Sequence, residues 1–392
     1  MRSMLVIFMK EVLENLRDRR TITNALIVGP LLGPLLFSGL TSVMINRELD
    51  KGEKALEVPV IGTENAPNLV EFLKQHNIQP KPPVDDPEQK IRAQDTDFVL
   101  RIPANFGEAW SKGEPAQVEL LYDASQRDSG SSVDRLRNVL EAYGRQTGAL
   151  RLLSRGLSPS VATPLVVADR DQSTPQSRSA LLFGMLPYFL ILSSFMGGMY
   201  LAIDTTAGER ERQSLEPLFA NPVARTSILN GKLLATFAFA MTSLSLSLIA
   251  FGIAGHQFIP TDKLGMVLDF GPSFAFIALF MMVPLVSLAS ILQTLIAAFA
   301  KSYREAQTYL SLLMLIPIIP SAMLSILPVK AQSWMYAVPL LGQHLTITRL
   351  VRGETVAGVD IALCMVSGLM IAFVAWLVTA LVYRSEKLAI SA

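Results

Sequence analysis

The residues best suited to chemistry lie in one short charged segment, residues 208–225, between two long apolar runs. The segment alternates in charge and then becomes apolar at helical spacing. Its candidate binding residues are Glu209, Arg210, Glu211, Arg212, Ser214, Leu215, Glu216, Leu218 and Phe219. A helix of this kind offers ion pairs and a small apolar face, which are the means by which proteins dock onto one another. The sequence therefore predicts a docking element for a partner protein.

Catalytic and metal-binding patterns are missing from the sequence. Gly231-Lys232 has no glycine-rich loop upstream, so it does not form a phosphate cradle. The three histidines are far apart in the chain, and the single cysteine, Cys364, lies within an apolar run. We therefore expect no metal, no bound cofactor and no enzyme activity in this chain, and ATP, if it is used, must bind to another chain.

Two of the apolar runs carry hydroxyl and amide side chains in place of charged ones. The candidates for a translocation path are Ser243, Ser247, Ser290, Gln293 and Thr294. Buried carboxylates are typical of ion-coupled carriers, and the interiors of these runs have none. Serine and threonine also let membrane helices pack closely, and that interpretation stays open beside a polar path.

Six apolar runs reach the length of about 20 residues that a membrane-spanning helix needs. They cover residues 22–44, 181–203, 233–254, 273–300, 309–327 and 361–382. Charged residues make up 17% of the chain, against roughly 25% in soluble domains. The net charge is only +1, and the charged residues are distributed along the chain rather than collected in one basic patch. We therefore expect no nucleic-acid partner. The first run is too long for a signal peptide and is predicted to be a retained anchor.

Lysine and arginine concentrate on one side of these spans. They occur in residues 2–20, in residues 210–232 and at Lys301 and Arg304. The positive-inside rule then places both termini and the charged segment in the cytoplasm. A membrane-embedded chain of this type is also in contact with lipid along its spans.

The chain is predicted to have three parts. Residues 1–45 form an interfacial helix and the first span, residues 46–180 an extracytoplasmic domain, and residues 181–392 the other spans, with a cytoplasmic coupling helix within 204–232. In the outer domain, apolar runs alternate with helical patterns, which favours a mixed α/β unit. The expected strands are 58–61, 98–102, 118–122 and 164–167, and the expected helices 65–76, 85–93, 104–112 and 131–156. Pro80, Pro82 and Pro83 predict a surface loop.

The stretch between the fifth and sixth spans, residues 328–358, is too apolar for a free loop and too interrupted for a spanning helix. Pro339, Gly342 and Gln343 lie at its centre. Irregular backbone at membrane depth is tolerated when it is buried against protein, so we expect a re-entrant segment. The predicted fold class is an α-helical membrane protein with six transmembrane helices, a large extracytoplasmic mixed α/β domain after the first, and this re-entrant segment.

Several motifs in this order resemble the permease subunits of type-2 ABC exporters. They are Glu-Arg-Glu-Arg-x-Ser-Leu-Glu-Pro-Leu at 209–218, Asn-Pro-Val-Ala-Arg at 221–225 and Ile-Leu-Asn-Gly-Lys at 228–232. Pro-Leu-Leu-Gly-Gln at 339–343, with Arg-Gly-Glu at 352–354, is similar to the outer segment of the NatB-type branch, the membrane subunits of sodium-export ABC transporters. Many relatives carry Gly-Thr where this chain has Gln213-Ser214, and Ser214 can still cap the helix that follows.

The resemblance implies a permease of the bacterial inner membrane that pairs with a second copy or a paralogue. Two cytoplasmic ATPase subunits would hold ATP and Mg and receive the helix 209–219 in a groove. In that groove the four charges would set the register, and Leu215, Leu218 and Phe219 would be buried.

The resemblance implies sodium as the cargo. Export of drugs, peptides or lipids stays open, because hydroxyl-lined spans fit either cargo. A ligand-sensing membrane receptor is the alternative from a different class. Six spans and a coupling-type helix exceed what a receptor requires.

Overall fold

The computed structural model describes residues 2–125, 130–165, 168, 170–261, 266–267, 270–327 and 329–384. The chain divides into two compact units, one of Met1–Val43 with Gln172–Ala392 and the other of Met44–Asp171. The second unit ends earlier than the predicted 180. The reason is helix α8 (Pro175–Phe183), which packs against α17 (Leu341–Val351) of the first unit.

Six helices are long and apolar enough to cross a membrane in the described part of the chain, which confirms the six predicted spans. They are Ile22–Arg47, Leu186–Glu211, Arg225–Phe258, Pro272–Phe299, Tyr303–Ile326 and Gly358–Arg384. The second span begins at Leu186 rather than at residue 181, because α8 ends at Phe183 and a turn separates the two helices.

The helical unit is built from the following elements. Its N-terminal part contains α1 (Arg2–Asn15), α2 (Arg19–Thr21), the π-helix η1 (Ile22–Val28) and, up to Val43, the helix α3 (Gly29–Glu53). After α8 come α9 (Leu186–Ile203), the π-helix η5 (Asp204–Gly208), α10 (Glu209–Glu211), α11 (Leu215–Ala220) and α12 (Arg225–Phe258). The C-terminal part contains α14 (Pro272–Phe299), α15 (Tyr303–Leu313), α16 (Leu315–Ile326), the short 3₁₀-helix η6 (Ser333–Ala337), α17 and α18 (Gly358–Arg384).

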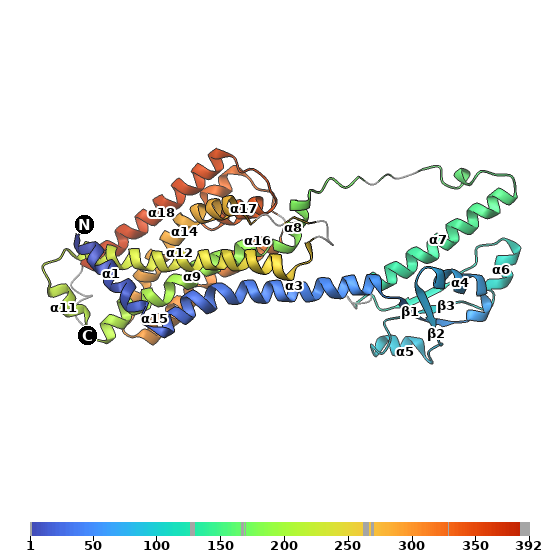
Figure 1. The fold of residues 1–392 in the computed structure, drawn as a ribbon, viewed down its shortest axis with the longest axis horizontal. Helices are drawn as coiled ribbons and strands as arrows, with labels where there is room; N and C mark the ends of the chain where they lie inside the picture. Colours follow the sequence, from blue (N-terminus) through green and yellow to red (C-terminus); the bar gives the residue numbers. More distant parts are fainter. Residues whose placement is uncertain are drawn as a thin grey trace. The chain divides into compact units, whose positions relative to one another are not determined.

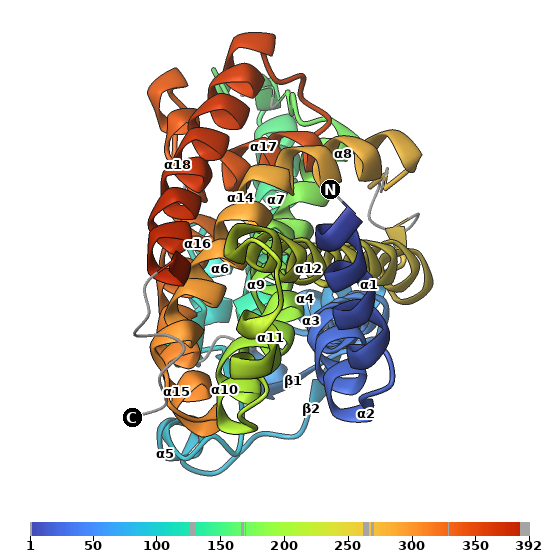
Figure 2. The ribbon, with the colours of Figure 1, turned by 90° about the vertical axis from the view of Figure 1, so that its left-hand side faces the viewer.

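Helix α9 lies at the centre of this unit. In its membrane-spanning window 72% of the residues are buried, against 17% in the windows of the first and last spans. Helices α12 and α14 pack on α9, and α18 packs on α14 (Figure 1). Helix α1 lies beside α12 at the end of the bundle that carries α10 and α11 (Figure 2). The amphipathic pattern of α1 explains this contact, since Ile7, Glu11 and Asn15 share its buried face.

The second unit is a four-stranded sheet with helices. Its strands are β1 (Leu56–Ile61), β2 (Ile78–Lys81), β3 (Phe98–Arg101) and β4 (Glu119–Tyr122), in the order β2-β1-β3-β4. Strand β1 is parallel to β2 and β3, and β3 is antiparallel to β4. The helices are η2 (Thr63–Asn65), α4 (Pro67–Gln75), α5 (Pro87–Arg92), α6 (Phe106–Lys112), α7 (Gly130–Ser154) and η4 (Pro159–Val161). The unit has its own core, in which Val60, Leu73 and Leu100 are fully buried.

Two strand predictions were wrong in this unit. Strand β2 includes Pro80, which the sequence indicated to be in a loop, and it pairs with β1 at the edge of the sheet. Proline is tolerated there because an edge strand leaves one row of N–H groups unpaired in any case. The predicted strand 164–167 is not a strand at 164–165, and residues 166–167 lie outside the described residues.

We expect residues 49–171 to fold when expressed alone, because this unit buries a core that does not depend on the spans. The isolated fragment should give a mixed α/β far-UV circular dichroism spectrum and a single cooperative thermal transition. Leu100→Ala should lower its stability by about 3 kcal/mol, since Leu100 is 0% exposed and such truncations leave a cavity. A disordered spectrum would contradict the assignment of an independent unit.

Candidate functional site: the charged segment and a buried ion cluster

The charged segment is two short helices rather than the single amphipathic helix that the sequence predicted. Helix α10 ends at Glu211, and Gln213, with a φ of +55°, turns the chain before α11 begins at Leu215. Ser214 does not cap α11 with its side chain, contrary to prediction. Its hydroxyl instead donates a hydrogen bond to the Glu209 carbonyl at 3.1 Å, because the turn at Gln213 directs it back onto α10.

Glu209 lies in a buried ion cluster, which we define as Lys10, Glu11, Glu209 and Lys232. The Glu209 carboxylate accepts hydrogen bonds from Lys232 and, at 2.9 Å, from Lys10. Glu11 lies 3.4 Å from the Lys232 ammonium group and 3.3 Å from that of Lys10. Lys232 is 0% exposed, Glu11 2% and Glu209 7%. The cluster therefore ties three elements together, namely α1, α10 and α12.

Besides the four contacts among its own members, the cluster has a contact with Thr205 of the π-helix η5. The Lys232 ammonium group also donates to the Thr205 carbonyl at 2.5 Å. A π-turn widens the helix and displaces carbonyls from their α-helical partners, and such turns occur often at functional positions. Lys232 is thus satisfied by two carboxylates and one carbonyl, which makes the burial of its charge tolerable.

The two members of the cluster on α1 have shifted pKa values. Burial lowers the pKa of Lys10, but the hydrogen bond to Glu209 and the charges of Glu209, Glu11 and Glu14 outweigh burial and raise it above its usual value. Burial raises the pKa of Glu11, and the charge of Lys232 opposes this shift without cancelling it. Glu11 is therefore the carboxylate of the cluster that holds its proton more tightly than usual.

The next two charges of the segment bind helix ends of the same chain. Arg210 donates to the carbonyls of Ala298 and Ala300, where α14 ends, at 3.5 and 3.4 Å. Glu211 accepts a 2.7 Å hydrogen bond from the backbone N–H of Tyr303, where α15 begins. A cation at a helix C-terminus and an anion at an N-terminus both match the helix dipole. Together they hold α10 across the junction of α14 and α15.

The rest of the segment is more accessible. Arg212 is paired with Asp204, yet 58% of its side chain is exposed, and Ser214 is also exposed. Leu218 is half-buried and lines a cavity of about 350 Å³ with Val6 and Ile7 of α1. Phe219 packs on the core formed by α12, α14 and α18, with Arg225 5.2 Å above its ring. The side chains of Leu215 and Glu216 lie outside the described residues.

The five path candidates all lie in contacts between α9, α12 and α14, and each is at most 2% exposed. Ser243 is 3.2 Å from Ser193, and the Gln293 amide nitrogen donates to the Phe195 carbonyl at 2.7 Å. Ser290 and Thr294 donate to carbonyls one turn earlier in their own helix, Val286 and Ser290 respectively. The Ser247 hydroxyl and the Gln293 amide oxygen have no hydrogen-bond partner in the described structure.

Gly197 sets the closest approach between α9 and α12. A β-carbon built on Gly197 would lie 2.4 Å from the Ser243 β-carbon, and one on Gly198 would lie 3.0 Å from the Gln293 amide oxygen. Glycines at such positions let membrane helices pack backbone to backbone. The pair therefore places the polar side chains of α12 and α14 against α9.

We expect Gly197→Ala to destabilise the protein by about 1–3 kcal/mol, because overpacking forces the α9–α12 interface apart. Gly252→Ala on α12 is the matched control, since its added β-carbon would meet nothing closer than 3.9 Å. Thermal inactivation in detergent, followed by size-exclusion chromatography, measures both. Equal midpoints for the two variants would show that the α9–α12 interface accommodates an added methyl group.

The predicted re-entrant segment contains two helices, η6 and α17. Gln343 is fully buried, and its side-chain oxygen accepts a 2.7 Å hydrogen bond from the Leu340 N–H. Leu340 has a φ of +75°, a conformation that a non-glycine residue adopts at an energetic cost. A β-carbon on Gly342 would lie 2.6 Å from the Tyr336 carbonyl, so η6 and α17 touch through this glycine. Pro339 lines an apolar cavity beside α9.

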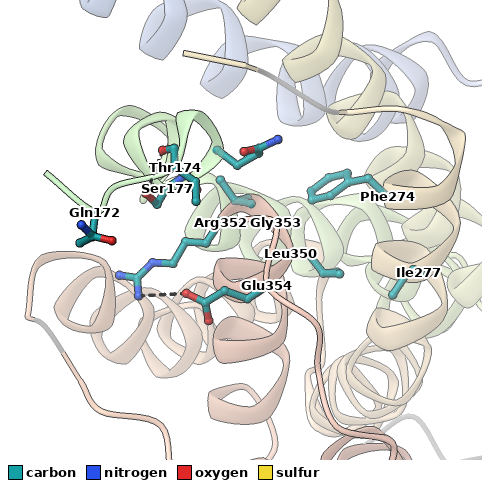
Figure 3. Close-up of a pocket in the computed structure, with 11 residues that line it drawn as sticks. Gln172, Thr174, Ser177, Phe274, Ile277, Leu350, Arg352, Gly353 and Glu354 are labelled. Atoms are coloured by element: carbon teal, nitrogen blue, oxygen red, sulfur yellow. Dashed lines mark hydrogen bonds and ion pairs between the residues drawn. The ribbon is translucent and has the colours of Figure 1, made fainter. Parts of the chain in front are cut away.

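A polar cavity of about 620 Å³ lies between α8, α14 and the end of α17. Figure 3 shows Gln172, Thr174 and Ser177 on one side of it and Phe274 and Ile277 on another. Arg352 and Glu354 form its floor as an ion pair of 3.9 Å, which is longer than a hydrogen bond.

No group of three or more potential metal ligands occurs among the described residues. Sequence reasoning did not single out the other three members of the ion cluster, Lys10, Glu11 and Lys232. One sequence feature could have revealed these residues. Lys232 and Glu11 fall on the apolar faces of their helices, and a charged residue at such a position implies a partner of opposite charge.

The comparisons with known proteins agree with this architecture. Residues 25–383 match the family described as ABC-2 family transporter protein. The chain is 25% identical over 352 residues to the ABC transporter permease protein NatB of Bacillus subtilis (strain 168), which covers 88% of this chain and 89% of that protein. No solved structure matched the chain. The chain therefore belongs to the ABC-2 transporter family, as a membrane-spanning permease subunit that works with a separate ATPase.

Proposed function

We propose that this permease is the membrane subunit of an ATP-driven exporter and that residues 208–225 receive the movement of the ATPase. The observation that carries the proposal is the buried ion cluster, in which Glu209 is bound to Lys10 of α1 and Lys232 of α12. Arg210 and Glu211 extend the contact to α14 and α15. A push on α11 would reach four helices through these pairs. Among them the Lys232–Glu209 pair is buried, and separating it would be costly.

The proposed topology has both termini and the charged segment in the cytoplasm of a bacterium and the spans in its inner membrane. The α/β unit, Met44–Asp171, then lies outside, and η6 and α17 enter the outer leaflet as the re-entrant segment. Two permease chains, identical or paralogous, pair with two ATPase subunits that hold ATP and Mg. Cysteine labelling with a membrane-impermeant reagent tests the topology, with labelling expected at Ser111→Cys and not at Gln213→Cys in intact cells.

Sodium is the cargo that we propose first, on the basis of the NatB-like sequence. The oxygen atoms of Ser247 and Gln293 have no hydrogen-bond partner among the described residues, and each is a proposed cation contact within the bundle. The test is the ATPase rate of the complex with its ATPase as sodium replaces potassium at constant ionic strength. We expect saturable stimulation, reduced in Gln293→Leu. A rate indifferent to sodium would refute this cargo.

Export of an organic cargo is the second candidate, and one observation favours it. A cavity of about 540 Å³ lies between α9, α14 and α16, and its lining is almost wholly apolar, with Phe195, Leu288 and Met323 among its residues. Cavities of this size and character accommodate small organic molecules. Stimulation of the ATPase by amphipathic compounds but not by sodium would favour this reading.

A further inference from the structure

Two cavities at the end of the bundle that carries α8 and α17 share a wall. The first is the apolar cavity between α9, α14 and α16. The second, of about 620 Å³, lies between α8, the end of α16 and α17. Leu324, Leu327 and Val329 line both of them. The two cavities are therefore immediate neighbours, one on each side of these three residues.

The second cavity is basic. Lys330, Arg349 and Arg352 line it with a single carboxylate, that of Glu354. Arg349 lies 3.8 Å from Glu354 and 3.7 Å from Asp360, which approaches from outside the lining, and Arg352 lies 3.9 Å from Glu354. No hydrogen bond or ion pair of Lys330 is found within the described structure. These pairs are longer than charge-assisted hydrogen bonds of about 2.8 Å, so the cations keep donors for an incoming anion.

A buried polar atom without a partner lies on the same cavity wall. His344 is 2% exposed, and its Nδ1 atom has no hydrogen-bond partner in the described structure. Burial lowers the pKa of His344 to about 4, so the ring is neutral near neutral pH. Buried polar atoms are nearly always hydrogen-bonded in native proteins, and an exception needs an explanation.

We propose that these two cavities bind one anionic amphiphile, with its carboxylate or phosphate at Lys330, Arg349 and Arg352 and its hydrocarbon part in the apolar cavity. The charge excess selects an anion, and the guanidinium groups suit a planar or tetrahedral oxyanion. The apolar cavity excludes a wholly polar ligand, because a polar group there would lose its hydration without compensation. The site deepens the organic-cargo alternative, but binding to it needs neither ATP nor the ATPase.

The test measures radiolabelled oleate binding to the full-length permease in phosphatidylcholine nanodiscs without ATP. Oleate should bind saturably, and oleyl alcohol, which has the same chain without the charge, should compete poorly. Lys330→Gln combined with Arg352→Gln should raise the Kd about tenfold or more, the loss expected for hydrogen bonds to a charged group. Both side chains are exposed enough for the variant to fold. Met323→Gln, on the apolar wall, should also weaken binding.

The matched control is Arg304→Gln, which removes an exposed cation on α15 outside both cavities and should leave the Kd unchanged. An unchanged Kd in the Lys330→Gln/Arg352→Gln variant, or equal competition by oleyl alcohol, would overturn the proposal. Replacing part of the phosphatidylcholine with phosphatidylglycerol distinguishes the two sources of such a ligand. Reduced oleate binding assigns the site to a membrane lipid, and unchanged binding assigns it to a free amphiphile. Failure here would leave the sodium test and the docking test unaffected.

Discussion

Lys232→Met is expected to destabilise the permease by about 3 kcal/mol, at the lower end of the range for breaking a buried ion pair. The substitution removes the fully buried cation that faces Glu209 and Glu11. Lys10, whose side chain is 45% exposed, keeps its contacts with both carboxylates and offsets part of the loss. The measurement is the midpoint of thermal unfolding of the purified protein, followed by loss of the monodisperse size-exclusion peak.

The control for this prediction is Lys301→Met, which removes an exposed lysine and should shift stability by less than about 0.5 kcal/mol. The deficit of Lys232→Met should shrink when Glu209→Gln is added, because one uncompensated carboxylate is then neutral. Equal midpoints for Lys232→Met and Lys301→Met would show that the cluster contributes nothing to the fold.

The Lys232→Met variant should recover stability as the pH falls below neutral. Burial already raises the pKa of Glu11 in the wild-type protein, and the removal of Lys232 takes away a charge that lowers it. The folded state then binds the Glu11 proton more tightly than the unfolded state does, so a fall in pH favours the folded state. A deficit that widens on acidification would contradict this account.

The six spans could be predicted from the sequence because a membrane helix needs only length and hydrophobicity, and both are properties of a continuous stretch. The ends of the spans were predicted less accurately. The second helix extends past Ile203 through the π-helix η5 to Glu211, since Asp204 and Glu209 find partners there that no local pattern reveals. Strand β2 was missed for a similar reason, because its pairing with β1 outweighs the turn preference of Pro80.

The ion cluster could not be predicted, because its members are distant in the sequence. Glu11 and Glu209 are brought together by the packing of α1 on α12, a contact between helices that hydrophobic periodicity does not specify. The sequence assigned Glu209, Arg210 and Glu211 to a partner protein, whereas each contacts its own chain. Of the charged residues in that set whose side chains are described, Glu211 and Arg212 are exposed.

In the proposed complex with the ATPase, α11 would therefore provide the main docking contact. Leu218 is half-buried, so part of its side chain faces α1 and part remains free. Helix α10 would then fix the orientation of α11 through the contacts of Glu209, Arg210 and Glu211 with the rest of the bundle. Apolar side chains held in a fixed orientation commonly carry most of the binding energy of a protein interface.

Leu218→Asp is accordingly expected to abolish co-purification of the permease with its ATPase while leaving membrane insertion intact. The substitution buries a charge in an apolar contact, which costs several kcal/mol and corresponds to at least a hundredfold weaker binding. Gln213→Asp adds the same charge at an exposed position that does not line the cavity beside Leu218, and should preserve the complex. Pull-down of a tagged ATPase from membranes that contain equal amounts of each permease variant measures both. Unchanged recovery of the ATPase with Leu218→Asp would refute docking through α11. Equal loss with Gln213→Asp would indicate repulsion by charge rather than an apolar anchor.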